Sequence, residues 1–189
     1  GSRLAVSDTS GEVRSWPLAG RTATPERVLQ ARGTLRLGFD PTGRWLSARG
    51  SLDGRPGLRL WNLYAPSAVE PTLLVRSDTT YMNTLAFDGS GHWLATAHAG
   101  DVALWWLGDD RPRVLTGHEG RVAGLTFAPD SRSLLSAGGD DTVRRWPLSA
   151  GGEEPRVVFR GSVGAGPNLE IDPSGRLLVV DFAPHDLEF

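Results

Sequence analysis

The chain has 189 residues, with 20 basic and 22 acidic side chains and a formal net charge of −2 at pH 7. It therefore lacks the excess of positive charge that is typical of proteins that bind a nucleic-acid backbone. It contains no cysteine, which excludes disulfides, thiolate metal sites and cysteine nucleophiles. No apolar run approaches the roughly 20 residues that span a bilayer, and we expect a cytoplasmic protein with neither nucleic-acid nor membrane partners.

Four copies of a tryptophan-centred hexapeptide organise the chain. They read VRSWPL, LRLWNL, VALWWL and VRRWPL, and their tryptophans are separated by 45, 44 and 41 residues. A recurring period of this length indicates one supersecondary unit repeated along the chain. The predicted anchors of the repeated units are Trp16, Trp61, Trp105 and Trp146.

The sequence between the copies contains the same kinds of segment in the same order each time. A short apolar pair after Pro or Arg (ERVLQ, PTLLV, PRVLTG, PRVVFRG) precedes an alternating segment (TLRLGF, NTLAF, AGLTF, NLEI). A turn follows (DPTGR, DGSGH, APDSR, DPSGR), then a strand rich in Leu and small residues, then the Trp segment. Period-2 alternation over short lengths predicts half-buried strands, and no segment has the period of a helix. The insertion SLDGRPG at 51–57 predicts one unusually long turn.

Four short antiparallel strands per unit resemble a blade of the WD-repeat β-propeller family. The best copy, from Arg113 to Leu148, carries the family's Gly-His pair at Gly117 and His118, with Trp146 standing 28 residues after the histidine. The other copies lack the Gly-His pair at the matching place and keep only the apolar skeleton, and all four copies lack the Asp that should follow the Trp. The resemblance is therefore to degenerate repeats, and the Arg-rich, Lys-free usage is typical of a GC-rich bacterial genome.

The resemblance implies an all-β propeller of four-stranded antiparallel blades, three complete and two partial. We expect a partial blade over 1–30, blades over about 31–76, 77–117 and 118–160, and a partial blade over 161–189. Propellers of this family close with more blades, and closure removes exposed sheet edges. We therefore expect a segment of a larger propeller, completed by further chain, by another protein or by self-association.

The resemblance also implies a structural hydrogen-bond network of His118, Ser136, Asp140 and Trp146, in which Asp140 holds the imidazole. The same residue types form hydrolytic triads, but Ser136 lies within strand text, without the sharp turn that presents a nucleophile. We therefore predict no catalytic residue.

No metal or cofactor is expected either. The four histidines lack the spacing of a helical ligand pair, and the acidic pairs lack the alternation of a calcium loop. His92, His98 and His185 are expected to be exposed turn residues. For Trp45, Trp93 and Trp106 packing is favoured over a role as an exposed interaction hot spot.

In WD-repeat proteins, partners contact the loops that lead into the inner strands. Carried onto this chain, that rule selects Tyr81, Asn83 and Arg121 as candidate partner-binding residues. The predicted function is a non-enzymatic protein-interaction, scaffold or sensing module, the recognition part of a larger bacterial signalling protein. Two alternatives remain: a hydrolase with a central-channel site, for which the inner strands offer only Asn83 and Glu170, and a structural segment completed by another chain.

Overall fold

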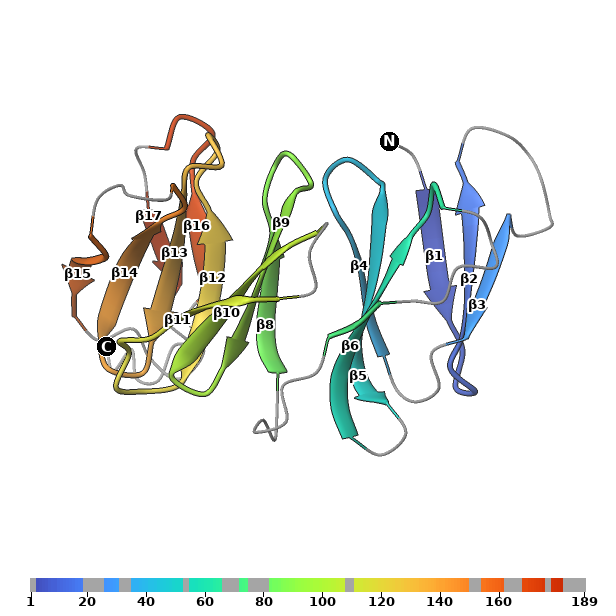
Figure 1. Ribbon diagram of the computed structural model, residues 1–189, viewed down its shortest axis with the longest axis horizontal. Helices are drawn as coiled ribbons and strands as arrows, with labels where there is room; N and C mark the ends of the chain where they lie inside the picture. Colours follow the sequence, from blue (N-terminus) through green and yellow to red (C-terminus); the bar gives the residue numbers. More distant parts are fainter. Residues whose placement is uncertain are drawn as a thin grey trace, which may run out of the picture. The chain divides into compact units, whose positions relative to one another are not determined.

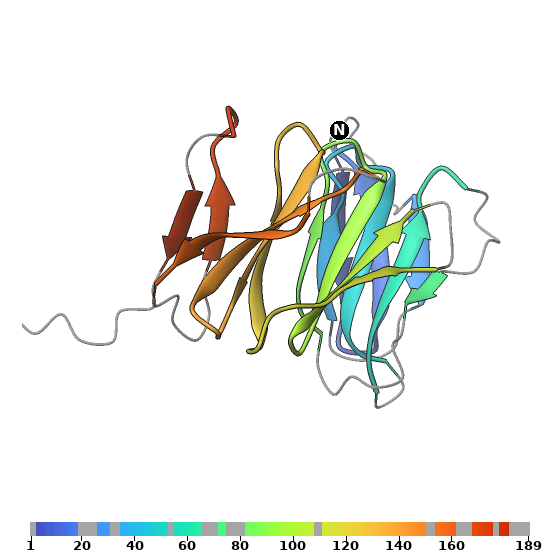
Figure 2. The same ribbon diagram turned by 60° about the vertical axis from the view of Figure 1, so that its left-hand side comes forward.

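The computed structural model describes residues 3–18, 26–30, 35–52, 55–65, 72–74, 82–107, 111–149, 154–161, 168–175 and 178–181. Within these ranges all regular structure is β, in strands numbered β1 to β17 (Figures 1 and 2). None of the described residues belongs to a helix that could cross a membrane. The chain divides into two compact units, Gly1–Met82 and Asn83–Phe189.

The first unit holds two antiparallel sheets, ordered β1-β2-β3 and β4-β5-β6-β7 (Figure 1). A cluster of buried apolar side chains joins them, with Val13 and Leu29 from one sheet and Leu46 and Trp61 from the other. The strands are β1 (Arg3–Ser7), β2 (Glu12–Pro17), β3 (Arg27–Gln30), β4 (Leu35–Phe39), β5 (Trp45–Leu52), β6 (Arg55–Asn62) and β7 (Thr72–Leu74).

The second unit holds three antiparallel sheets, ordered β8-β9-β10-β11, β12-β13-β14-β15 and β16-β17. Figure 2 shows the two-stranded sheet beside the sheet that begins with β12. The strands are β8 (Met82–Phe87), β9 (Trp93–His98), β10 (Asp101–Trp106), β11 (Arg113–Leu115), β12 (Val122–Phe127), β13 (Ser133–Gly138), β14 (Thr142–Pro147), β15 (Arg156–Arg160), β16 (Asn168–Ile171) and β17 (Leu178–Asp181).

Small and branched apolar side chains fill the space between successive sheets of the second unit. Ala97 and Leu104 pack in one cluster with Phe127 and Trp146 from the next sheet. On the other face of that sheet, residues including Val143 pack with Leu169 of β16. Successive side chains of a strand point to opposite faces of its sheet, so alternate residues of one strand pack in two different apolar clusters.

The predicted fold class is confirmed. Three sheets have four antiparallel strands, and in the described residues they are preceded by a three-stranded sheet and followed by a two-stranded one. Each strand pairs with its neighbour in sequence, as the repeated order of segments predicted.

The predicted long turn at 51–57 is wrong. β5 and β6 continue their antiparallel register through it, with Gly50 opposite Gly57 and Leu52 opposite Arg55. Because a hairpin satisfies its backbone hydrogen bonds by pairing, an insertion shared between two adjoining strands lengthens the hairpin instead of its turn.

The turn after each inner strand has one repeated geometry. Its first residue accepts a backbone hydrogen bond from the fourth, and the fourth residue has a positive φ. Glycine occupies that fourth place in three of the turns, and Ser131, with a φ of 53°, occupies it in the other. The pairs of first and fourth residues are Asp40 and Gly43, Asp88 and Gly91, Ala128 and Ser131, and Asp172 and Gly175.

Candidate functional site

A buried chain of hydrogen bonds joins two strands of one sheet, the turn between them and the loop that leads into a third strand. Trp146 on β14 donates its indole N–H to Ser136 Oγ on β13, over 2.7 Å. The same oxygen lies 2.7 Å from His118 Nε2, in the loop that leads into β12. His118 Nδ1 lies 2.8 Å from Asp140 Oδ1, in the turn between β13 and β14. The structure thus brings together all four residues of the network that the resemblance implied.

The directions of these bonds follow from the two groups at the ends of the chain of hydrogen bonds. An indole nitrogen can only donate, so Ser136 Oγ accepts from Trp146. An ionised carboxylate can only accept, so His118 Nδ1 carries a proton and donates to Asp140, and Nε2 of the neutral imidazole accepts from the Ser136 hydroxyl. Each donor of this hydrogen-bond network thus faces an acceptor, and a buried polar network stabilises a fold when its members are paired in this way.

Asp140 collects donors beyond the histidine. Thr142 Oγ1 donates to its Oδ1 over 2.8 Å, and the Glu119 backbone N–H donates to its Oδ2 over 3.1 Å. Burial alone raises the pKa of Asp140. The hydrogen bonds from His118, Thr142 and Glu119 outweigh burial and lower that pKa from 3.8 to about 2. The carboxylate thus stays ionised and ties the loop before β12 to the β13–β14 turn.

Glycines make room for the network. A Cβ at Gly138 would lie 2.4 Å from His118 Nδ1 and 2.9 Å from Asp140 Oδ1. Gly117 has a φ of 148°, and a Cβ there would lie 3.0 Å from Arg144 Nη1. The sequence analysis selected Asp140 but missed Gly138 and Thr142, although each lies two residues from it in the string SAGGDDT.

The order of Ser136, His118 and Asp140 is that of a hydrolytic triad, but no substrate can reach the serine oxygen. Ser136 is 0% exposed, and its oxygen is already engaged by both Trp146 and His118. A nucleophile needs a lone pair facing a substrate and an adjoining site for the developing oxyanion. The geometry therefore suits fixing three segments of backbone in one position.

A second polar chain occurs in the preceding sheet. Trp105 on β10 donates its indole N–H to Thr96 Oγ1 over 3.0 Å, and this oxygen lies 2.8 Å from His98 Nε2. His98 is 3% exposed, so the expectation of an exposed turn residue is wrong. Thr96 and His98 are two apart on β9 and share one face of the strand, a spacing from which the pair could have been found.

The predicted anchors differ in their environment. Trp61, Trp105 and Trp146 are buried, whereas Trp16 is half-buried. Among the other tryptophans, Trp45 is buried as expected and carries the Arg44 guanidinium 5.7 Å from its ring.

Of the candidate partner-binding residues, Arg121 is exposed at the start of β12. Tyr81 lies outside the described residues, and Asn83 is described only as a backbone position of β8.

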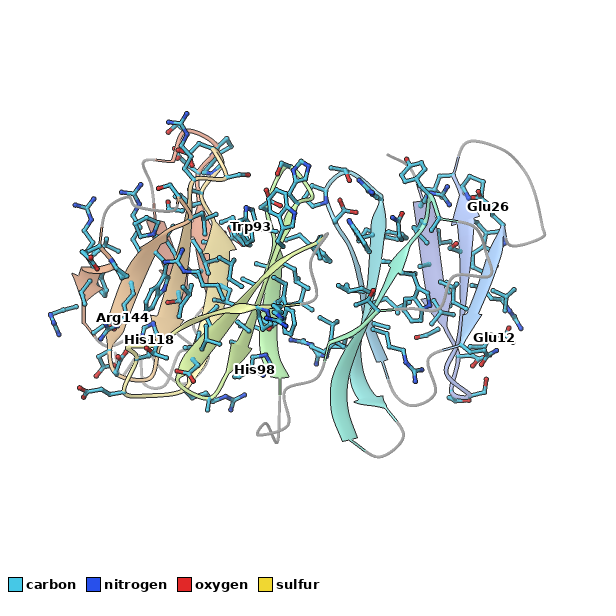
Figure 3. The ribbon with its side chains drawn as sticks, in the orientation of Figure 1. Glu12, Glu26, Trp93, His98, His118 and Arg144 are labelled. Carbon is cyan, nitrogen blue, oxygen red and sulfur yellow. The ribbon has the colours of Figure 1, made fainter. Side chains whose placement is uncertain are left out.

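The loop that carries Arg121 is fixed by its neighbours. The Val122 N–H donates to Ala99 O over 2.6 Å, and the Gly139 N–H donates to Arg121 O over 2.9 Å. The turns at 99–100 and 139–141 and the loop at 118–121 therefore form one end of the second unit, called here the loop end. Figure 3 shows His98 and His118 toward this end and Trp93 toward the other.

Metal-binding groups are not gathered at any point of the described chain. No set of three or more His, Cys, Asp or Glu residues there could hold an ion.

Comparison with known proteins places the network in context. The family model described as "WD domain, G-beta repeat" matches residues 110–147, which include all four network residues. A WD repeat-containing protein of Synechocystis sp. is 36% identical over 40% of this chain and 22% of its own length. The WD repeat and SOCS box-containing protein 1 of Takifugu rubripes is 30% identical over 70% of this chain and 31% of its own length.

A subunit of the target of rapamycin complex of Schizosaccharomyces pombe is 29% identical over 60% of this chain and 35% of its own length. The chain thus spans about a fifth to about a third of the length of these relatives.

Proposed function

Because this chain belongs to the WD-repeat family, we propose that it is a non-enzymatic protein-interaction module whose partner binds at the loop end. Arg121 is the residue on which the partner's affinity depends most. The observation that carries this proposal is the rigid presentation of an exposed arginine by a loop that is fixed on both sides.

Rigidity at the loop end supports recognition in a direct way. A partner that binds a flexible loop must order it, and each ordered side chain reduces the net affinity. Here the ordering is already achieved inside the protein, because the buried network holds His118 and Asp140 while backbone hydrogen bonds hold Arg121. Arginine is also enriched among residues that dominate binding energy in interfaces.

The relatives support an assembly role. One of them is named as a subunit of a complex, and another combines WD repeats with a SOCS box. We extend the proposal to the recognition part of a larger bacterial signalling protein of the cytoplasm; the Synechocystis relative supports only the occurrence of such repeats in bacteria.

A charge reversal tests the proposal. Arg121→Glu should abolish capture of the partner from a lysate of the source organism, while a thermal melt shows that the exposed position tolerates the change and the chain still folds. Arg132→Glu is the matched control, since Arg132 is also exposed but lies in the turn before β13, at the opposite end of that strand. A partner captured equally by both variants would contradict the assignment of the loop end.

One observation favours a structural role as a second candidate. In the three-stranded sheet, Leu4 and Val6 on β1 are 47% and 49% exposed, and they share a face with the half-buried Trp16. The corresponding face around Trp61 is covered by Val13 and Leu29. We propose that further β-structure, supplied by a second copy of the chain, covers this face.

A further inference from the structure

Three aromatic rings gather at the end of the second unit opposite the loop end. The rings of His92 and Trp106 are stacked, with centroids 5.2 Å apart and planes 8° apart, and Trp93 meets Trp106 edge to face at 4.8 Å. Trp93 and Trp106 are directly opposite in the β9–β10 register. We call His92, Trp93 and Trp106 the aromatic platform.

The platform is open to solvent at its centre. Trp106 is 43% exposed, which contradicts the expectation that it packs in a core. Exposed tryptophan is uncommon unless it serves an interface. In the part of the chain that the structure describes, the indole N–H groups of Trp93 and Trp106 have no acceptor, whereas those of Trp105 and Trp146 donate to hydroxyls.

The rings are held in place before any ligand arrives. Ser90 Oγ donates to Asp88 Oδ2, so its lone pair accepts from His92 Nδ1 at 2.8 Å. Asp88 also accepts from the backbone N–H groups of His92 and Trp93, at 2.9 and 2.7 Å. Burial raises the pKa of Asp88, but these bonds, with one from Ser131, outweigh it and keep the carboxyl ionised. The imidazole is thereby fixed flat against Trp106.

The platform is specific to this sheet. The backbone carbonyls of Arg44, His92 and Arg132 accept the same hydrogen bond from the residue after the Trp strand. The places matching Trp106 hold Asn62, opposite Trp45, and Pro147, opposite Ser133. Since the backbone geometry is shared and the stacked pair is not, packing of the fold does not require these two side chains.

The chemistry of the platform selects its ligand. The exposed face of Trp106 lies beside two indole N–H groups that no described residue accepts from. Such a surface fits a segment that presents both apolar rings and carbonyl groups without internal hydrogen bonds. A polyproline II segment does so, because its backbone carbonyls make no internal hydrogen bonds, and its proline rings dock on aromatic surfaces.

A cationic side chain is the competing ligand, since cations also bind over indole rings. A lysine or arginine side chain carries donors and no acceptor, so it would leave the indole N–H groups of Trp93 and Trp106 unpaired, whereas a backbone carbonyl would accept from them.

From this geometry we infer that the aromatic platform is a docking site for a proline-rich segment of a protein partner, with prolines stacked on Trp106 and carbonyls accepting from the indoles of Trp93 and Trp106. The site is independent of the loop end, so either assignment can fail without the other.

The test uses the 189-residue chain and an acetylated octaproline peptide. Among the seven tryptophan indole N–H resonances, those of Trp93 and Trp106 should shift saturably, and those of Trp105 and Trp146 should not. A glycine-serine peptide of equal length should shift none. Trp106→Asn uses the residue found at the matching place in another sheet, and it should weaken octaproline binding at least tenfold. Tyr64→Ala, which removes another exposed aromatic ring in the first unit, should leave binding unchanged.

Three results would overturn the inference. One is the absence of any octaproline-dependent shift at the Trp93 and Trp106 indoles. The second is equal binding by a folded Trp106→Asn variant. The third is a response of these indoles to tetramethylammonium but not to octaproline, which would assign a cation site instead. If the variant does not fold, the resonance shifts of the unmodified chain decide the question alone.

Discussion

Asp140 illustrates how a single side chain links two loops. The residue type and its distance from His118 along the chain were legible in one repeat. The further donors from Thr142 and Glu119 were not, because a backbone N–H leaves no mark in a sequence. These donors depress the pKa of the carboxyl, and that depression makes its contribution to folding pH-dependent.

We predict the following pH dependence for Asp140. Its pKa falls from 3.8 to about 2 on folding, so the carboxylate stabilises the folded chain fully above its unfolded pKa. That stabilisation is on the order of 1–2 kcal/mol once screening by solvent reduces the full value of the pKa difference, and it is lost as the pH falls from near 4 to near 2. Asp140→Asn keeps the shape without the charge. Denaturant melts of both proteins should differ at pH 6 and converge near pH 2, and a difference constant over this range would refute the assignment.

The histidines show where reasoning from single residues fails. Both His92 and His98 looked like turn residues, and only His92 is exposed. His98 belongs to the end of β9 and points its Nε2 at Thr96 within the sheet. The location of the strand end decides between these outcomes, and an end cannot be placed to one residue from propensity alone.

At the scale of elements, the turn between β13 and β14 shows why small residues occur where they do. Gly138 faces the imidazole of His118 so closely that no side chain fits between them. Gly89, in the turn between β8 and β9, has no atom nearer than 3.9 Å to the place of a Cβ. Two glycines in successive sheets thus differ in the room that their surroundings leave for a side chain, a difference that depends on packing.

This contrast yields a paired prediction. Gly138→Ala should destabilise the chain by about 2–3 kcal/mol, because the new methyl group displaces His118 and leaves buried polar groups unsatisfied. Gly89→Ala should be neutral or stabilising by up to about 1 kcal/mol, because it restricts the unfolded chain without a clash. Urea denaturation measures both. Equal effects of the two substitutions would mean that the network does not depend on the space at Gly138.

Strand order was predictable because period-2 alternation and the turn residues agree in every unit. The pairing of the insertion at 51–57 was not predictable, since its Gly and Pro residues are typical of a turn, yet Pro56 and Gly57 continue the β5–β6 ladder. Cross-strand register, and not local propensity, decides whether such a segment pairs.

At the scale of the molecule, the chain contains two compact units, each with its own apolar clusters. Repeated sheets bury their faces against neighbours, so a sheet without a neighbour on one side exposes apolar surface. The face of β1 that carries Leu4 and Val6 is the example in the described residues.

If a second copy covers this face, the chain should self-associate. Light scattering of the isolated chain should give a mass that rises with concentration. The double variant Leu4→Glu, Val6→Lys should remain a monomer, close to the 20.3 kDa of the unmodified chain, because burying unpaired charges against an apolar face is costly. Val114→Glu, at an exposed position of β11, should still associate. A well-folded monomer at all concentrations would exclude this structural role.

The sequence by itself determined the repeated unit and the order of its strands through periodicity, and the resemblance of one unit to a WD repeat implied the residues of its polar network. Only the tertiary structure decided that His98 is buried, that Gly138 leaves no room for a side chain beside His118 and that Trp106 joins His92 and Trp93 at the surface. The physical reason is that burial and stacking depend on contacts between strands and turns distant in the sequence, and no local pattern records those contacts.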